Sequence, residues 1–333
     1  MKGKRIQKAV VTGRFTLPAA FLLSVVFWVL AGTLVSLGAE EPFVDYPLWR
    51  AFSNLPLTAA VNALCSFLIY AVIGYLLILL NNTHAIIRMR ASVQTALYCM
   101  LISAFPGLPH RLHVGCLVVF ALLAALHLLF SSYQKERSEG DVFHAFLFIG
   151  IGSLLFPQLT WFVPVFWWGT YLFRSLTWRS FTASWLGLML PYALLCAYAY
   201  LVSDIGLFLL PLREVITVRP LFEGLTPSLA ATLVYLFVLL TGSFIHYLAA
   251  GLDDKTRIRC YLQFLILLSY CLGAYILLQP TPGVLLLPVM LVGISFLVGH
   301  LFVLTDSVGS NVFFVLMLVG LAALYGLNLW WLS

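Results

Sequence analysis

Long apolar runs that contain almost no charged residue constrain this chain more than any other feature of its sequence. Eleven such runs follow one another from residue 17 to residue 331. The hydrocarbon core of a bilayer is about 30 Å thick, and a helix needs about 20 residues to cross it. We therefore expect helices at residues 17–37, 57–80, 92–105, 112–130, 142–156, 159–173, 182–202, 227–250, 261–279, 283–304 and 310–331.

The composition excludes a soluble globular protein. Hydrophobic residues make up 62% of the 333 residues and charged residues only 9%, whereas about 25% of a soluble domain is charged. So few charges cannot cover a surface that faces water, and lipid must cover the rest. The sequence predicts an all-α fold, a polytopic transmembrane bundle of about eleven segments that forms a single domain over residues 1–333, with the bilayer as its main partner.

The distribution of Lys and Arg predicts the orientation of the chain. If the N-terminus is cytoplasmic, 14 of the 18 basic residues fall on the cytoplasmic side and 4 on the other, as the positive-inside rule expects. We therefore expect residues 1–16 to form a basic cytoplasmic terminus and the C-terminus to lie in the periplasm. Residues 38–56 and 203–226 form the main periplasmic loops.

Two of the apolar runs are short for a membrane crossing. Residues 92–105 and 142–156 would reach only about 21–22 Å as helices, and each is followed by a proline that interrupts a helix. The pairs at residues 92–130 and 142–173 are therefore either full hairpins or re-entrant segments packed against other helices. Both alternatives return the chain to the same side.

Three stretches within residues 81–192 carry a resemblance to a known group of proteins. They are NNTHAIIRMR, VFHAFLFIGIGSLLFP and FRSLTWRSFTASWLGLMLPY. In these stretches the chain resembles a family of uncharacterised integral-membrane proteins from Bacteroidota. The resemblance implies a bacterium with two membranes, so that the protein belongs to the inner membrane of the cell envelope. It implies no activity, cofactor or catalytic residue.

The charges of the predicted periplasmic loops suggest a site for a lipid-linked substrate. Asp45 or Glu41 could accept a proton from a hydroxyl group as a general base, and arginine binds phosphate oxygens well. The layout is similar to extracytoplasmic glycosyltransferases in placing acids directly after the first helix, although the loop has only 19 residues and lacks an acidic dyad. The alternative is that these are ordinary solvent-exposed charges. The candidate substrate-binding residues are Arg50, Arg111, Arg213 and Arg219.

The histidines suggest a second arrangement. Four of them fall near the cytoplasmic ends of their helices, and a fifth lies in a cytoplasmic connector, so they share a similar depth. A proton relay or metal site could use them together with Asp141 or Asp306, because imidazole titrates near neutral pH. No spacing typical of metal ligands occurs, and the alternative is interfacial or core histidines. The residues are His84, His127, His144, His246 and His300.

The sequence predicts no metal, no cofactor and no nucleic-acid partner. The six cysteines form no CxxC pair, and no nucleotide-binding fingerprint occurs. We expect a protein that handles a polyprenyl-linked or glycolipid substrate at the periplasmic face, as a glycosyltransferase, polymerase or flippase. The alternatives are a non-catalytic scaffold that assembles with another membrane protein, and a proton- or metal-coupled carrier.

Overall fold

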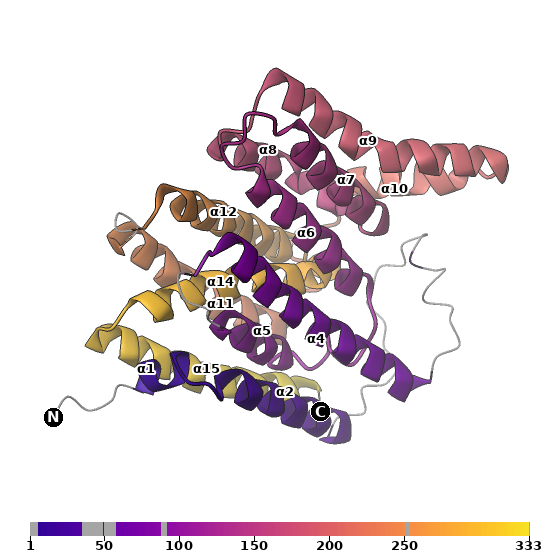
Figure 1. Cartoon of the computed structure of the whole chain (residues 1–333). Coiled ribbons are helices and arrows are strands. Elements are labelled where there is room, and N and C mark those ends of the chain that lie inside the picture. Colours follow the sequence, from indigo (N-terminus) through magenta and orange to yellow (C-terminus); the bar gives the residue numbers. More distant parts are fainter. Residues whose placement is uncertain (1–5, 35–48, 50–57, 88–91, 251–253, 333) are drawn as a thin grey trace.

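The computed structural model describes residues 6–34, 49, 58–87, 92–250 and 254–332 of the chain (Figure 1). Every regular element in these ranges is a helix. In the described residues, each of the eleven predicted runs is mainly helical, so the predicted all-α class is confirmed. The elements are α1 (Ile6–Val11), α2 (Thr16–Leu34), α4 (Ala59–His84), α5 (Val93–Ser103), α6 (Val114–Ser131), α7 (Glu139–Leu155), η1 (Pro157–Phe162), α8 (Val163–Leu172), α9 (Trp178–Leu201), α10 (Gly206–Ile216), α11 (Pro227–Ala250), α12 (Thr256–Leu278), α13 (Pro280–Gly283), η3 (Val284–Leu286), α14 (Leu287–Leu304) and α15 (Val308–Leu332).

Within the described residues, eight helical segments are long and apolar enough to cross a membrane. The other three predicted runs form shorter helices: α5 has 11 residues, α7 has 17, and η1 and α8 divide 16 residues between them. The predicted pair at residues 142–173 thus turns at η1, directly after Phe156. The long segments are α2, α4, α6, α9, α11, α12, α13 to α14, and α15.

The connectors that the distribution of Lys and Arg assigns to one side of the membrane lie together at one end of the bundle. Gln7 of α1 donates hydrogen bonds to the carbonyls of Phe302 and Thr305, which joins the N-terminal segment to the end of α14. The ends of α6 and α8 meet here too, because the hydroxyl of Ser132 donates to that of Ser175. We call this the basic end. Its described cations are Lys8, Arg14, Lys135, Arg137, Arg174, Arg179, Lys255, Arg257 and Arg259.

The segment from α13 to α14 is the centre of the bundle. In the most apolar 18-residue stretch of this segment, 94% of the residues are buried, whereas the share is 17% in α2 at the periphery. Small residues let neighbouring helices approach it closely. A Cβ atom at Gly293 would lie 2.2 Å from the hydroxyl of Ser269 on α12, and one at Gly299 would lie 3.5 Å from the backbone of Gln94 on α5.

Helices α7 and α9 pack with their backbones in close contact. A Cβ atom at Gly187 of α9 would lie 2.3 Å from the carbonyl oxygen of Phe143 on α7, and one at Gly150 of α7 would lie 2.8 Å from that of Leu188. Such contact is typical of small residues at membrane helix interfaces. Figure 1 shows this pair at one edge of the bundle and α2 with α15 at the other.

The predicted loops contain two helices that hydropathy does not indicate. The basic terminus, residues 1–16, contains α1, and the predicted loop 203–226 contains α10. Helix α10 is amphipathic, and the indole of Trp161 holds its last turn by donating to the carbonyl of Val215 at 3.0 Å. Apart from Trp49, the predicted loop 38–56 lies outside the described residues.

Helix α5 does not reach across the bundle. At about 1.5 Å per residue its 11 residues span about 16 Å, and residues 104–113 continue as turns and bends to the start of α6. Ten of the 11 side chains are buried. The backbone that follows α5 is tolerated at this depth because it is buried in protein.

Candidate functional site

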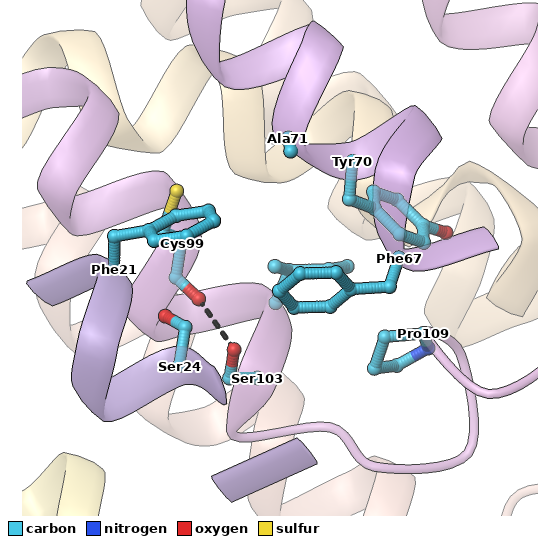
Figure 2. A pocket seen from close by; sticks show the side chains of 9 residues that line it. Phe21, Ser24, Phe67, Tyr70, Ala71, Cys99, Ser103 and Pro109 are labelled. Carbon is cyan, nitrogen blue, oxygen red and sulfur yellow. Dashed lines mark hydrogen bonds between the residues drawn. The ribbon is translucent and has the colours of Figure 1, made fainter. Parts of the chain in front are cut away.

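A hollow lies between α2 and α4, with α5 as its floor (Figure 2). Its cavity volume is only about 20 Å³, and it opens to the outside. The ring of Phe67 on α4 lies 5.9 Å from that of Phe21 and 5.2 Å from that of Trp28, both on α2. We call this hollow the α2–α4 crevice. It is lined by Phe21, Ser24, Phe67, Tyr70, Ala71, Cys99, Ile102, Ser103 and Pro109.

The crevice is apolar at its mouth and contains hydroxyl groups deeper inside. Figure 2 shows the hydroxyl of Ser103 bonded to the carbonyl of Cys99, at 2.8 Å. The hydroxyl of Ser24 is buried and has no hydrogen-bond partner among the described residues. A buried hydroxyl without a partner costs about 1–3 kcal/mol, so a ligand group that reached Ser24 would remove that cost.

A buried hydrogen-bonded set lies behind the crevice and joins α4 to α6. The hydroxyl of Tyr70 lies 2.8 Å from Nε2 of His113, and the thiol of Cys116 donates to the same hydroxyl at 3.4 Å. All three residues are buried. The set can supply a polar contact to a ligand only through Tyr70, which lines the crevice.

The segment after α5 holds α2 in place at the rim of the crevice. His110 has Nδ1 2.8 Å from the carbonyl of Pro106 and Nε2 2.9 Å from that of Trp28. The indole of Trp28 stacks on the imidazole and donates to the carbonyl of Pro109 at 3.3 Å.

The candidate arginines divide between two parts of the molecule. The backbone of Arg111 lies beside α4, because its carbonyl accepts from the hydroxyl of Ser66 at 2.9 Å. Arg213 is on α10, and Arg219 follows it, with its backbone bonded twice to the side chain of Gln279 after α12. Of the candidate arginines that the structure describes, only Arg111 therefore lies next to the crevice. Glu41, Asp45 and Arg50 lie outside the described residues.

The histidines form two separate pairs at the basic end instead of one layer. Nε2 of His84 lies 3.1 Å from Nδ1 of His127. The rings of His246 and His300 lie 5.9 Å apart, and His300 also pairs with Asp254. His144 stands apart and bonds the carbonyl of Gly140 in its own helix.

The carboxylate that meets a histidine is not one that the sequence analysis selected. Asp254 lies 3.2 Å from His300, whereas Asp141 pairs with Lys135 and Asp306 with Lys8. The sequence could have pointed to Asp254, because this residue lies directly before α12 at the depth of the histidines. No group of three His, Cys, Asp or Glu that could hold a metal occurs in the part of the chain that the structure describes.

These features define the class of the protein. Eight long apolar helical segments and short connectors that gather at the two ends describe a multi-pass α-helical membrane protein. No family model, no curated protein and no solved structure matches the chain. The resemblance to proteins of Bacteroidota therefore stays a prediction.

Proposed function

We propose that this protein binds a polyprenyl-linked or glycolipid substrate, with its chain in the α2–α4 crevice and its headgroup at the end opposite the basic end. In the proposed orientation the protein lies in the inner membrane, the basic end is cytoplasmic, and the headgroup faces the periplasm. The α2–α4 crevice is the observation that carries this proposal. It is apolar, lies along two membrane helices and is partly open at its side.

The connectivity of the chain supports the position of the headgroup. The segment that carries Glu41, Asp45 and Arg50 connects α2 to α4, the two walls of the crevice. Arg111 lies beside the start of α6 at the same end. In the proposed site Arg111 and Arg50 bind the phosphate of the lipid. Asp45 or Glu41 then acts as the general base if the protein is a glycosyltransferase or polymerase, and neither is needed for this purpose in a flippase.

Arg213 and Arg219 are left out of this headgroup site. Helix α10 packs against α9 and η1, and Arg219 is fixed to Gln279. These residues belong instead to a surface at the other edge of the bundle. We propose about eleven membrane segments, of which α5 and the turns after it form one broken crossing.

The direct test is binding of a photoreactive polyprenyl phosphate to the purified full-length protein in lipid nanodiscs. Ala71→Trp fills the crevice and is expected to lower labelling at least tenfold. Val72→Trp is the matched control, because Val72 is the next residue on α4 and is exposed on its outer face. Arg111→Gln is expected to lower labelling about fivefold, and Arg213→Gln to leave it unchanged. Equal labelling of the Ala71 and Val72 variants would contradict the proposal.

The buried pair of Asp254 and His300 favours a second function, a proton-coupled carrier. Ionisable pairs inside membrane proteins often mark proton pathways, and His246 lies beside this pair. A carrier would move a substrate across proteoliposomes in response to a pH gradient, and His246→Gln would abolish this transport. The lipid-handling proposal instead predicts substrate binding that is independent of His246.

A further inference from the structure

A cluster of arginines and histidines lies at the basic end, where α4, α6 and α8 end and α12 begins. We call it the Arg257 cluster, and it is independent of the α2–α4 crevice. Arg257, Arg174 and His127 are exposed, Arg259 is half-buried, and His84 is buried beneath them. It consists of His84, His127, Arg174, Arg257 and Arg259.

The side chain of Arg257 is held in one position. Its Nε donates to the hydroxyl of Tyr261 at 2.6 Å, and the guanidinium carbon lies 5.4 Å from the centre of the same ring. The hydroxyl of Tyr261 in turn donates to the carbonyl of Phe130 at the end of α6, at 2.7 Å. An arginine that serves only as a topology signal needs no such support, whereas a binding residue benefits from losing its freedom before the ligand arrives.

The hydrogen bonds of His84 and His127 leave one N–H donor directed toward the surface. Nη2 of Arg257 lies 3.5 Å from Nδ1 of His84, and a guanidinium can only donate. Nδ1 of His84 is therefore an acceptor, and its Nε2 carries the proton that it donates to Nδ1 of His127. This leaves the Nε2–H group of the exposed His127 as a donor at the surface.

Arg174 and Arg259 lie around the same part of the surface as Arg257 and His127. Arg174 follows α8 in a left-handed conformation with φ of 56°, and both Arg174 and Arg257 lie near the phenol of Tyr133. Burial raises the pKa of Tyr133, and these two guanidinium groups oppose the rise. Arg174 and Arg259 likewise both lie near the thiol of Cys260 on α12.

The cluster has no negative charge to balance it among the described residues. None of the ion pairs there includes Arg174, Arg257 or Arg259. The first turn of α12 contains no acidic residue, although a helix N-terminus carries a partial positive charge that disfavours cations. Among the described residues, guanidinium groups, an outward imidazole donor and a helix N-terminus thus lie together without a counterion.

We propose that the Arg257 cluster binds a phosphate group, either of an anionic phospholipid or of a phosphate free in solution. Arginine binds phosphate oxygens with two parallel hydrogen bonds, and the free N–H groups of a helix N-terminus are further donors to an anion. Arg257 and Arg174 contact the phosphate from two sides, and His127 donates from a third.

The test measures the binding of added ligands to the delipidated full-length protein in neutral detergent, by native mass spectrometry and thermal unfolding. The ligands are phosphatidylglycerol, inorganic phosphate and, as a control without phosphate, diacylglycerol. Arg174→Gln is the main variant, because the side chain of Arg174 makes no hydrogen bond to the described residues and its backbone bond to Tyr171 is kept, and Arg257→Gln is the second. Arg137→Gln is the matched control, since Arg137 is exposed at the same end but lies outside the cluster.

The wild type and the Arg137 variant are expected to bind phosphatidylglycerol, and the Arg174 and Arg257 variants about fivefold more weakly. A basic residue near an anionic membrane surface contributes about 1 kcal/mol, which corresponds to this factor. Binding of phosphatidylglycerol alone assigns the site to a lipid headgroup, and binding of inorganic phosphate as well assigns it to a soluble phosphate. Equal binding by the Arg137 and Arg174 variants, or no binding by the wild type, would overturn the proposal. Ala71→Trp is expected to leave this binding unchanged, which separates it from the crevice.

Discussion

Asp254 and His300 form a buried pair, with 3.2 Å between Oδ2 and Nε2, and their side chains are only 2% and 4% exposed. The pair joins the segment before α12 to the end of α14, the helix at the centre of the bundle. A buried pair of this kind is weak evidence for stability in itself, but the loss of one partner leaves the other without compensation.

Asp254→Asn is therefore expected to lower the free energy of unfolding by about 3 kcal/mol. Lys8→Gln is the control, because it removes an exposed ion pair with Asp306, and exposed pairs contribute about 0–1 kcal/mol. Unfolding in detergent, followed by circular dichroism, measures both changes. If the two variants lose equal stability, the pair of Asp254 and His300 does not join these helices.

Gly187→Ala is expected to destabilise the contact between α7 and α9. The added Cβ atom would lie 2.3 Å from the carbonyl oxygen of Phe143, and overpacking of a close contact costs about 1–3 kcal/mol. Gly140→Ala on α7 is the matched control, since its Cβ atom would have no neighbour within 4 Å. It should stabilise the helix slightly. Thermal unfolding checks the prediction, and an increase in melting temperature for both variants would refute it.

His110 is expected to hold α2 in its position. Its ring nitrogens lie 2.8 Å and 2.9 Å from the carbonyl oxygens of Pro106 and Trp28, and an internal hydrogen bond contributes about 0.5–1.5 kcal/mol. His110→Phe should therefore lower the free energy of unfolding by about 1 kcal/mol, measured in detergent by circular dichroism. An unchanged free energy of unfolding would mean that His110 does not hold α2.

Hydropathy placed the helices correctly because lipid imposes one rule on every long apolar run. It failed at the helix ends. The predicted helix 261–279 starts in the structure at Thr256, so that Arg257 and Arg259 belong to α12, since a helix can continue beyond the hydrocarbon layer. Hydropathy also missed α10. This helix has only one apolar face, which gives a weaker hydropathy signal than a continuous apolar run, and it contains Pro211.

The sites could be predicted only in part. The common depth of the histidines was visible in the sequence, but their division into two pairs depends on how α4, α6, α11 and α14 turn about their axes. The same holds for Tyr70 of α4 and for His113 and Cys116 at the start of α6. Arg257 and Tyr261 are one turn apart on α12, and their contact was missed because the predicted helix began only at residue 261. Side-chain partners on different helices are set by packing, and hydropathy does not contain that information.

The most direct measurement for the whole account is the accessibility of the two ends of the bundle in intact cells. Single cysteines at Thr217, after α10, and at Ser307, before α15, are both exposed positions at opposite ends. They would be introduced into a variant that lacks the six native cysteines and be labelled with a maleimide that does not cross membranes. Thr217→Cys is expected to react in intact cells and Ser307→Cys only after permeabilisation. Labelling of Ser307→Cys from outside would contradict the orientation on which the proposed substrate site depends.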